Sequence, residues 1–181
     1  VLAAANTKAV TRAAESWVAK LNPKDSRFEH HLFEALTVYE THEVVEPALL
    51  GRLLAAKEPN ARAYAAGVVA RWADRLDQPL DLLVPLIGDE YPRVRLAAIV
   101  AAANIPGARS LDLALRSLDR PADKFLDHAL RQTVYALKPH WLPALTNGQL
   151  EAAKHPARLE FLVKADSTPD TLKGLRSLLQ S

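Results

Sequence analysis

Residues 89–98 read DEYPRVRLAA, and they carry the signals of a helix start. Proline is tolerated in the first turn of a helix because the N–H group that it lacks would have no intrahelical partner there. The apolar residues after Pro92 recur with the three- and four-residue spacing of one buried helix face, at Val94, Ala97, Ala98, Ala101 and Ile105. We therefore expect an amphipathic helix that begins at Pro92.

The same pattern recurs along the chain. Pro59, Pro121 and Pro156 each precede a run with this apolar spacing, and Ser26 holds the corresponding place before the first run. Repeats of 20 to 50 residues are typical of solenoids. The repeat predicts helices that begin near residues 26, 59, 92, 121 and 156. Their expected buried stripes are Phe28, Leu32, Leu36 and Tyr39; Ala61, Ala65, Val68 and Trp72; the stripe after Pro92; and Leu126, Leu130, Val134 and Leu137.

A second set of shorter helices is expected between these runs, around residues 49–54, 82–87 and 111–118. The connections 77–79, 105–107 and 138–140 are short and contain helix breakers, and short connections force neighbouring helices to run antiparallel. The sequence therefore predicts an all-α fold, an α-solenoid of stacked antiparallel helix pairs. We expect one domain over residues 1–181, with about five pairs.

The charge balance and the composition exclude several classes of protein. The chain has 23 basic and 21 acidic residues, a net charge of +2, which does not suit a dedicated polyanion binder, and it has no cysteine for disulfides or thiolate chemistry. Its central charge-free stretch, residues 96–108, is shorter than the roughly 20 residues of a membrane-spanning helix. The chain starts at Val1 without a signal-like segment. We expect a fragment of a larger protein, with no membrane span.

Residues for catalysis or for binding a cofactor or metal are not apparent. The six histidines include no pair spaced three or four apart, and the one ligand-like spacing, His30 with Glu34, is typical of a solvated helix pair. The glycines are too widely spaced for a phosphate-binding loop or a nucleophile elbow. We therefore predict no catalytic, cofactor-binding or metal-binding residues in this chain.

Two of the three tryptophans are expected in the core. Trp72 lies on an apolar stripe, and Trp141 lies beside Leu142 and Leu145. Trp17 could pack inward or lie at an exposed end of the array. The sequence leaves both options open.

The stretch 89–98 resembles the HEAT repeat, whose second helix typically opens with Asp, then Pro, then Val-Arg and a stripe of small residues. Residues 57–62 and 119–124 are less similar, because they keep the proline and a basic residue three positions later but not the valine. The resemblance implies an α-solenoid of helix pairs, and in our functional interpretation the second helices line its concave surface.

A narrower resemblance rests on residues 121–145, with Glu29–His30 and residues 36–39 upstream. These segments are similar to the HEAT-repeat region of large bacterial PVC-type haem-binding proteins, also described as membrane-bound dehydrogenases. In that family the repeats lie between a propeller and a cytochrome-like module with a C-x-x-C-H motif. Roughly residues 26–150 share the pattern. The resemblance implies an extracytoplasmic parent protein in which this chain is a spacer without chemistry of its own.

The basic residues at equivalent repeat positions, Arg62, Arg95 and Lys124, are expected to form a ladder, with Glu29 in the equivalent place of the first repeat. In one interpretation these charges pair internally, for instance Arg62 with Glu29 or Arg95 with Asp89. In the other, a basic concave surface faces a partner. Its candidate residues are Arg62, Arg71, Arg93, Arg95, Lys124, His128, Arg131 and Arg158.

Two functions follow from this surface. The first is a non-catalytic scaffold that docks another protein or a neighbouring domain of the same chain by shape and charge. The alternative is nucleic-acid binding in the manner of HEAT-like DNA glycosylases, in which arginine and lysine contact phosphates. Because a net charge of +2 gives a weak field, we favour the protein scaffold and regard a nucleic-acid partner as the weaker alternative.

Overall fold

The computed structural model describes residues 6–178, which form helices joined by short connections, with no strand in that range. The helices are α1 (Thr7–Val18), α2 (Phe28–Thr41), α3 (Pro47–Leu54), α4 (Pro59–Arg71), α5 (Pro79–Ile87), α6 (Pro92–Ala103), α7 (Ala108–Leu115), α8 (Lys124–Ala136), α9 (Lys138–Thr146), α10 (Pro156–Ala165) and α11 (Pro169–Leu178), with the 3-10 turns η2 (Arg116–Asp119) and η3 (Glu151–Lys154).

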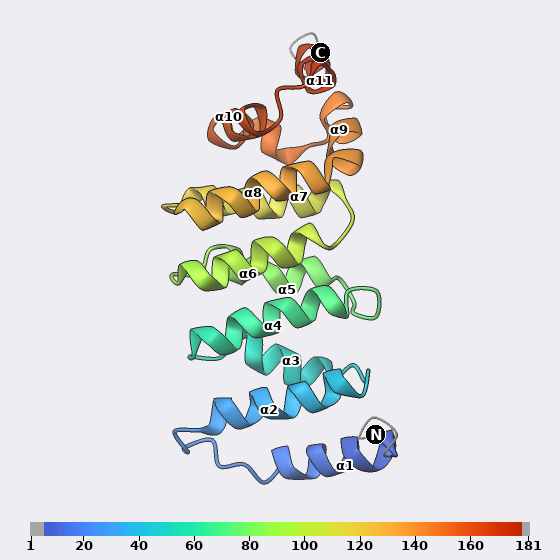
Figure 1. The fold of residues 1–181 in the computed structure, drawn as a ribbon, viewed down its shortest axis with the longest axis vertical. Coiled ribbons are helices and arrows are strands. Elements are labelled where there is room, and N and C mark those ends of the chain that lie inside the picture. Colours follow the sequence, from blue (N-terminus) through green and yellow to red (C-terminus); the bar gives the residue numbers. More distant parts are fainter. Residues whose placement is uncertain (1–5, 179–181) are drawn as a thin grey trace.

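From α1 to α8 the helices form four antiparallel pairs that stack along one axis (Figure 1). Each shorter helix packs against the longer helix that follows it, and the longer helices pack against one another between pairs. This arrangement confirms the predicted fold class, an α-solenoid of stacked helix pairs.

Three of the predicted helix starts are confirmed, because Pro59, Pro92 and Pro156 are the first residues of α4, α6 and α10. The start at Pro121 is wrong, since α8 begins three residues later. Asp123 caps α8 by accepting hydrogen bonds from the N–H groups of Phe125 and Leu126, both at 2.9 Å. Aspartate is among the best N-cap residues, so it sets the helix start in place of the proline.

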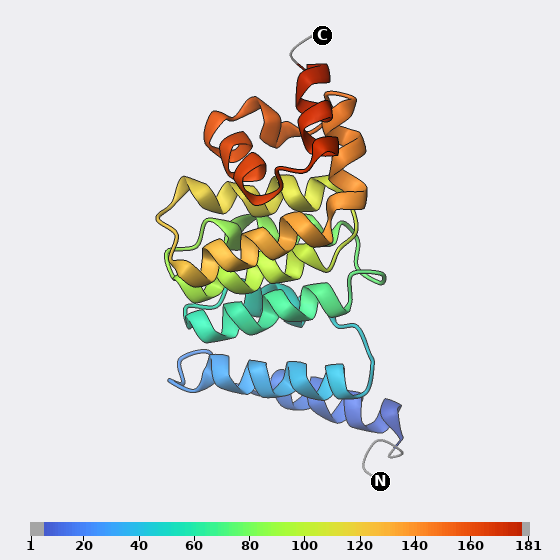
Figure 2. The same ribbon diagram turned by 45° about the horizontal axis from the view of Figure 1, so that its top comes forward.

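The last helices depart from the predicted repeat. Residues 138–140 were expected to be a connection, but α9 begins at Lys138, directly after Leu137, the C-cap residue of α8. Proline at the second position of α9 is compatible with a first helical turn. Figure 1 shows α9 along the long axis of the stack, whereas α8 lies across it. As Figure 2 shows, α9, α10 and α11 lie together at the C-terminal end of the stack, and the short turn η3 precedes α10.

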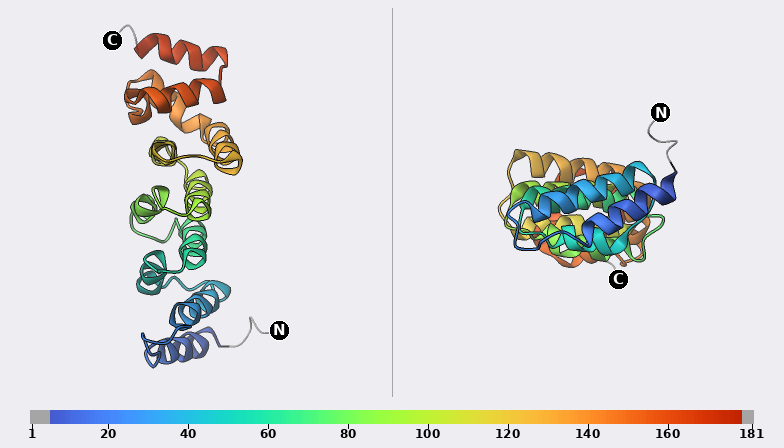
Figure 3. Two further views of the ribbon diagram at one scale, coloured as in Figure 1. Left: turned by 90° about the vertical axis from the view of Figure 1, so that its left-hand side faces the viewer. Right: turned by 90° about the horizontal axis from the view of Figure 1, so that it is seen from below.

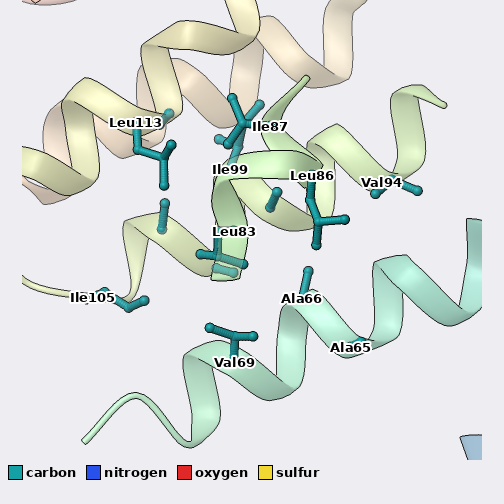
Figure 4. Close-up of a cluster of buried hydrophobic side chains, with 14 of the residues drawn as sticks. Ala65, Ala66, Val69, Leu83, Leu86, Ile87, Val94, Ile99, Ile105 and Leu113 are labelled. Carbon is teal, nitrogen blue, oxygen red and sulfur yellow. The ribbon is translucent and has the colours of Figure 1, made fainter. Parts of the chain in front are cut away.

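The core runs through the stack without interruption. Side chains from α4, α5, α6 and α7 converge in one apolar cluster (Figure 4). Of the predicted stripes, only Phe28 and Ala97 are partly exposed rather than buried. Trp72 and Trp141 are buried as expected, and the indole N–H of Trp141 donates to the Val134 carbonyl oxygen at 2.7 Å. Trp17 is 39 % exposed.

The longer helices α2, α4, α6 and α8 form one side of the stack. The α4–α6 and α6–α8 interfaces are much more extensive than those between α3 and α5 or α5 and α7. Alanines such as Ala65, Ala98 and Ala102 are buried at these helices and permit the close approach. In the left view of Figure 3, α4 and α6 are set back relative to α2 and α8, so this row of helices is the concave side.

Candidate functional site

We call the exposed sides of α2, α4, α6 and α8 the second-helix face. Seven of the eight basic residues predicted to face a partner come from α4, α6 and α8, and Arg158 comes from α10. The structure divides the set in two. Three residues are largely enclosed and bonded within the protein, namely Arg62, Arg95 and Arg158. The other five are exposed, namely Arg71, Arg93, Lys124, His128 and Arg131.

Arg62 links two successive repeats. Its Nε donates to Asp89 Oδ2 at 2.8 Å and its Nη2 donates to Asp89 Oδ1 at 3.0 Å, and both side chains are nearly enclosed. The hydrogen bonds that Arg62 donates to Asp89, together with the negative charge of that carboxylate, raise the pKa of the Arg62 guanidinium despite burial. Burial opposes ionisation of Asp89, but the hydrogen bonds from Arg62 and from the Tyr91 N–H outweigh it, so the pKa of Asp89 lies below its ordinary value. The pair is therefore charged at neutral pH.

Arg95 holds the same position one repeat later but bonds only to main-chain oxygens. Its Nη1 donates to the carbonyl oxygens of Asp89 at 2.7 Å and Glu90 at 3.1 Å, and its Nη2 donates to that of Pro121 at 2.9 Å. Arg62 contacts the equivalent carbonyl oxygens of its own repeat. This shared geometry identifies the position as a structural link between repeats.

The predicted internal pairing of the ladder is thus correct in kind, but its named partners are wrong. Arg62 pairs with Asp89 of the following repeat and not with Glu29 of the preceding one. The Glu29 carboxylate instead accepts hydrogen bonds from the N–H groups of Lys57 and Glu58, both at 2.8 Å. Arg95 contacts the carbonyl oxygen of Asp89 rather than its carboxylate.

Arg158 and Arg131 serve the packing of α10. Arg158 Nη2 donates to both carboxylate oxygens of Asp119, at 2.7 and 3.0 Å. Arg131 pairs with Asp127 on its own helix, and its guanidinium lies 5.3 Å from the ring centre of Phe161 on α10. These contacts hold α10 against the end of the regular stack.

A groove runs along the second-helix face between α4 and α6, with a volume of about 570 Å³. Its floor consists of small or short side chains, including Ala63, Gly67, Ala97 and Val100. The groove exists because these residues do not fill the space between the two helices. Asn60 and Arg93 lie at the end where α4 and α6 begin, and Arg71 and Asn104 lie at the other end.

The two arginines at the ends of the groove differ in their partners. Arg71 forms an ion pair with Glu40 of α2, and its guanidinium lies 5.6 Å from the ring centre of Tyr64. Tyr64 also donates a hydrogen bond to Glu40, and burial together with this carboxylate raises the pKa of Tyr64 to about 12. Arg93, in contrast, has no acidic partner among residues 6–178.

On α8 the second-helix face carries large exposed hydrophobic side chains next to cations. Phe125 is 61 % exposed and Tyr135 is 79 % exposed, and the Lys124 ammonium lies 5.1 Å from the Phe125 ring centre. These two aromatics were not predicted as surface residues, and neither were Tyr64 in the groove and its partner Glu40. The sequence contained one signal for the groove. Gly67 is an isolated glycine within a helical run, which indicates a close approach of two helices or unfilled space between them.

The described part of the chain contains neither a cluster of metal ligands nor a membrane-spanning helix. Within positions 6–178 there is no group of three or more His, Cys, Asp or Glu side chains that could hold a metal ion. None of the helices described there is both long and apolar enough to cross a bilayer.

Comparison with known proteins finds a repeat family whose model matches part of the chain. Residues 46–134 match the sequence model of the HEAT repeats, a range that spans α3 to α7 and most of α8. No curated protein and no solved structure matches the chain.

Proposed function

We propose that this HEAT-repeat α-solenoid is a non-catalytic scaffold that docks a protein, or a neighbouring domain of its own chain, on the second-helix face. HEAT repeats are generally protein-interaction scaffolds. The observation that carries the proposal is the row of exposed hydrophobic side chains on this face, Val100, Phe125 and Tyr135, beside the exposed cations of α6 and α8. Exposed apolar surface rimmed by polar residues is characteristic of interaction sites.

Site-specific crosslinking tests this scaffold function. A photoreactive phenylalanine analogue replaces Tyr135 on α8 or, as the matched control, Val84 on α5, which is 41 % exposed on the other side of the stack. Both proteins are expressed with the natural flanking sequence in the source cells. We expect crosslinks to a protein or to a flanking domain from position 135 and not from position 84. Equal yields at both positions, or none at either, would contradict the proposal.

A more specific role follows from the narrower resemblance. We propose that the chain is the helical spacer of a larger extracytoplasmic haem-binding or dehydrogenase-type protein, supported by the similarity of residues 121–145 to the repeat region of that family. The reading frame on both sides of Val1 and Ser181 tests this role. Propeller-like blades upstream, a C-x-x-C-H motif downstream and a signal peptide would support it, and start and stop codons directly at the two ends would refute it.

Nucleic-acid binding has less support. Arg62, Arg95 and Arg158 are held by contacts within the protein, and Arg71 and Arg131 are paired with carboxylates. Few cations are left to contact phosphates. A salt titration with duplex DNA distinguishes the two functions, because phosphate-driven affinity falls by orders of magnitude between about 50 and 200 mM salt. Tight, strongly salt-dependent binding would favour the nucleic-acid function over the scaffold.

A further inference from the structure

Building on the scaffold function proposed above, we infer that the α4–α6 groove binds a short acidic peptide segment of the partner, with one apolar side chain over Ala97 and Val100 and a carboxylate on Arg93. Four observations support this occupant: the shape of the groove, its apolar floor, its charge and its position.

The size of the groove matches a short peptide. Its lining residues extend from Asn60 to Arg71 on α4, a length of roughly 16 Å at 1.5 Å per helical residue. An extended segment of about five residues has the same length. The groove lies on the two helices that are set back in the concave row, where a partner would have to project a segment inward (Figure 3).

The floor of the groove suits an apolar side chain. Ala63 and Ala97 have only a methyl group each, and Val100 is 48 % exposed. The Arg71 guanidinium lies against Gly67, so the open apolar floor is on the Ala97 and Val100 side. An apolar residue placed there would remove the exposed face of Val100 from water, and burial of apolar surface is the main favourable term in association. Asn60 and Asn104 at the two ends can hydrogen-bond a peptide backbone.

The charge of the groove selects an acidic segment. Helices α4 and α6 contain four arginines and no aspartate or glutamate. Arg62 and Arg95 form hydrogen bonds between successive repeats, and Arg71 forms an ion pair with Glu40. Among residues 6–178, Arg93 is the arginine lining the groove that has no carboxylate within 4 Å and forms no link between repeats, and an arginine can bind a carboxylate through two parallel hydrogen bonds. One cation over an apolar floor fits a peptide carboxylate better than a polyphosphate backbone.

A peptide-display selection tests the inference. A random twelve-residue library displayed on phage is panned against the immobilised full chain, and the enriched peptides are synthesised and titrated by fluorescence anisotropy. We expect the enriched sequences to combine Asp or Glu with an apolar residue. Their binding should weaken as the salt concentration rises, because the Arg93 contact is solvent-accessible.

Two variants with matched controls locate the binding. Arg93→Glu reverses the charge at the groove, and Arg12→Glu makes the same change at an exposed site on α1. Gly67→Leu narrows the groove, because the new side chain and the Arg71 guanidinium that it displaces occupy part of it, and Gly51→Leu makes the same change on α3, where an added Cβ meets nothing within 4 Å. We expect each groove variant to raise the Kd about tenfold or more and each control to leave it within about twofold. Thermal melts verify that the variants are folded.

The other outcomes overturn the inference. Enriched peptides that are neutral or basic, an affinity unaffected by both groove variants, or no enrichment over an uncoated surface would each reject the groove as an acidic-peptide site. The scaffold function is tested separately, by the crosslinking experiment. Crosslinks from position 135 to a partner would support the scaffold function even if the groove inference is rejected, and their absence would contradict it.

Discussion

Arg62 of one repeat and Asp89 of the next form a two-point ion pair, with Nε–Oδ2 and Nη2–Oδ1 distances of 2.8 and 3.0 Å. The same arginine holds the carbonyl oxygens of Ala56 and Lys57. It therefore ties the connection before α4 to the connection before α6. In the following repeat the acceptor is the carbonyl oxygen of Pro121, so Arg95 links the two repeats through a main-chain atom.

Replacement of Asp89 by alanine is expected to destabilise the stack, because it leaves the enclosed Arg62 guanidinium without its acceptor. Hydrogen bonds to charged groups contribute about 1.5–3 kcal/mol. We expect a loss of about 2 kcal/mol in the free energy of unfolding and a Tm lower by about 4–8 °C. Urea denaturation measures the free energy of unfolding, and Glu90→Ala, at the exposed neighbouring residue, is the control. Equal losses in both variants would show that the pair contributes nothing specific.

The same pair predicts a pH dependence with a definite sign. The pKa of Asp89 is lowered in the folded protein, so its contribution to stability is present above the ordinary pKa of aspartate, about 4, and is lost as the pH falls through the folded value. The difference in unfolding free energy between the wild type and Asp89→Asn should therefore be largest near pH 7 and shrink below about pH 4. Urea titrations of both proteins from pH 7 to pH 3 measure this difference. A constant difference across that range would exclude the ion pair as its cause.

The fold was largely predictable because the repeat is a local signal. Proline at a helix start and apolar residues every three or four positions define each helix without reference to its neighbours. The end of the array was less predictable. Lys138–Pro139–His140 can end one helix or begin another, and the choice depends on the burial of Trp141 against α8, which is a tertiary contact.

The partners of the charged residues were also hard to predict, because they depend on how successive repeats pack against one another. The spacing of Arg62, Glu29 and Asp89 allows a backward or a forward pair, since each acid lies about one repeat away from the arginine. Only the packing of successive repeats selects Asp89. The groove was not predicted for a different reason. Apolar periodicity identifies the residues that fill the core, whereas the groove arises where small residues on α4 and α6 leave space unfilled.

An acidic residue at Val94 should disrupt the stack. Val94 is fully buried on α6, and an aspartate there would lie without a partner between two repeats. We expect Val94→Asp to lower the free energy of unfolding by more than about 3 kcal/mol, and Leu130→Asp on α8 to do the same. Arg93→Ala, one residue away but exposed, should change it by less than about 0.5 kcal/mol. Unchanged melting of both aspartate variants would refute the register of the repeats.

Gly67→Ala should stabilise the protein, although the position borders a charged side chain. Alanine is favoured over glycine inside a helix by about 1 kcal/mol. The new Cβ would lie 3.1 Å from Arg71 Nη1, the far end of a flexible side chain that can move. We expect a gain slightly below that of Gly51→Ala, where nothing lies within 4 Å. Chemical denaturation compares the two variants, and a net loss at position 67 would mean that Arg71 is held rigidly by Glu40 and Tyr64.

Asp112 on α7 anchors the C-terminal cluster to the regular stack. Its nearly buried carboxylate accepts hydrogen bonds from the N–H groups of Ala152 at 2.7 Å and Glu151 at 3.2 Å, which begin η3. Asp112→Ala would leave both N–H groups without an acceptor, at about 1–3 kcal/mol each where they remain buried. The loss should be local, because α4 to α6 pack without η3. Hydrogen exchange is therefore expected to accelerate over residues 150–165 and to stay unchanged over residues 59–103. Uniform acceleration along the chain would instead mean that the cluster and the stack unfold as one unit.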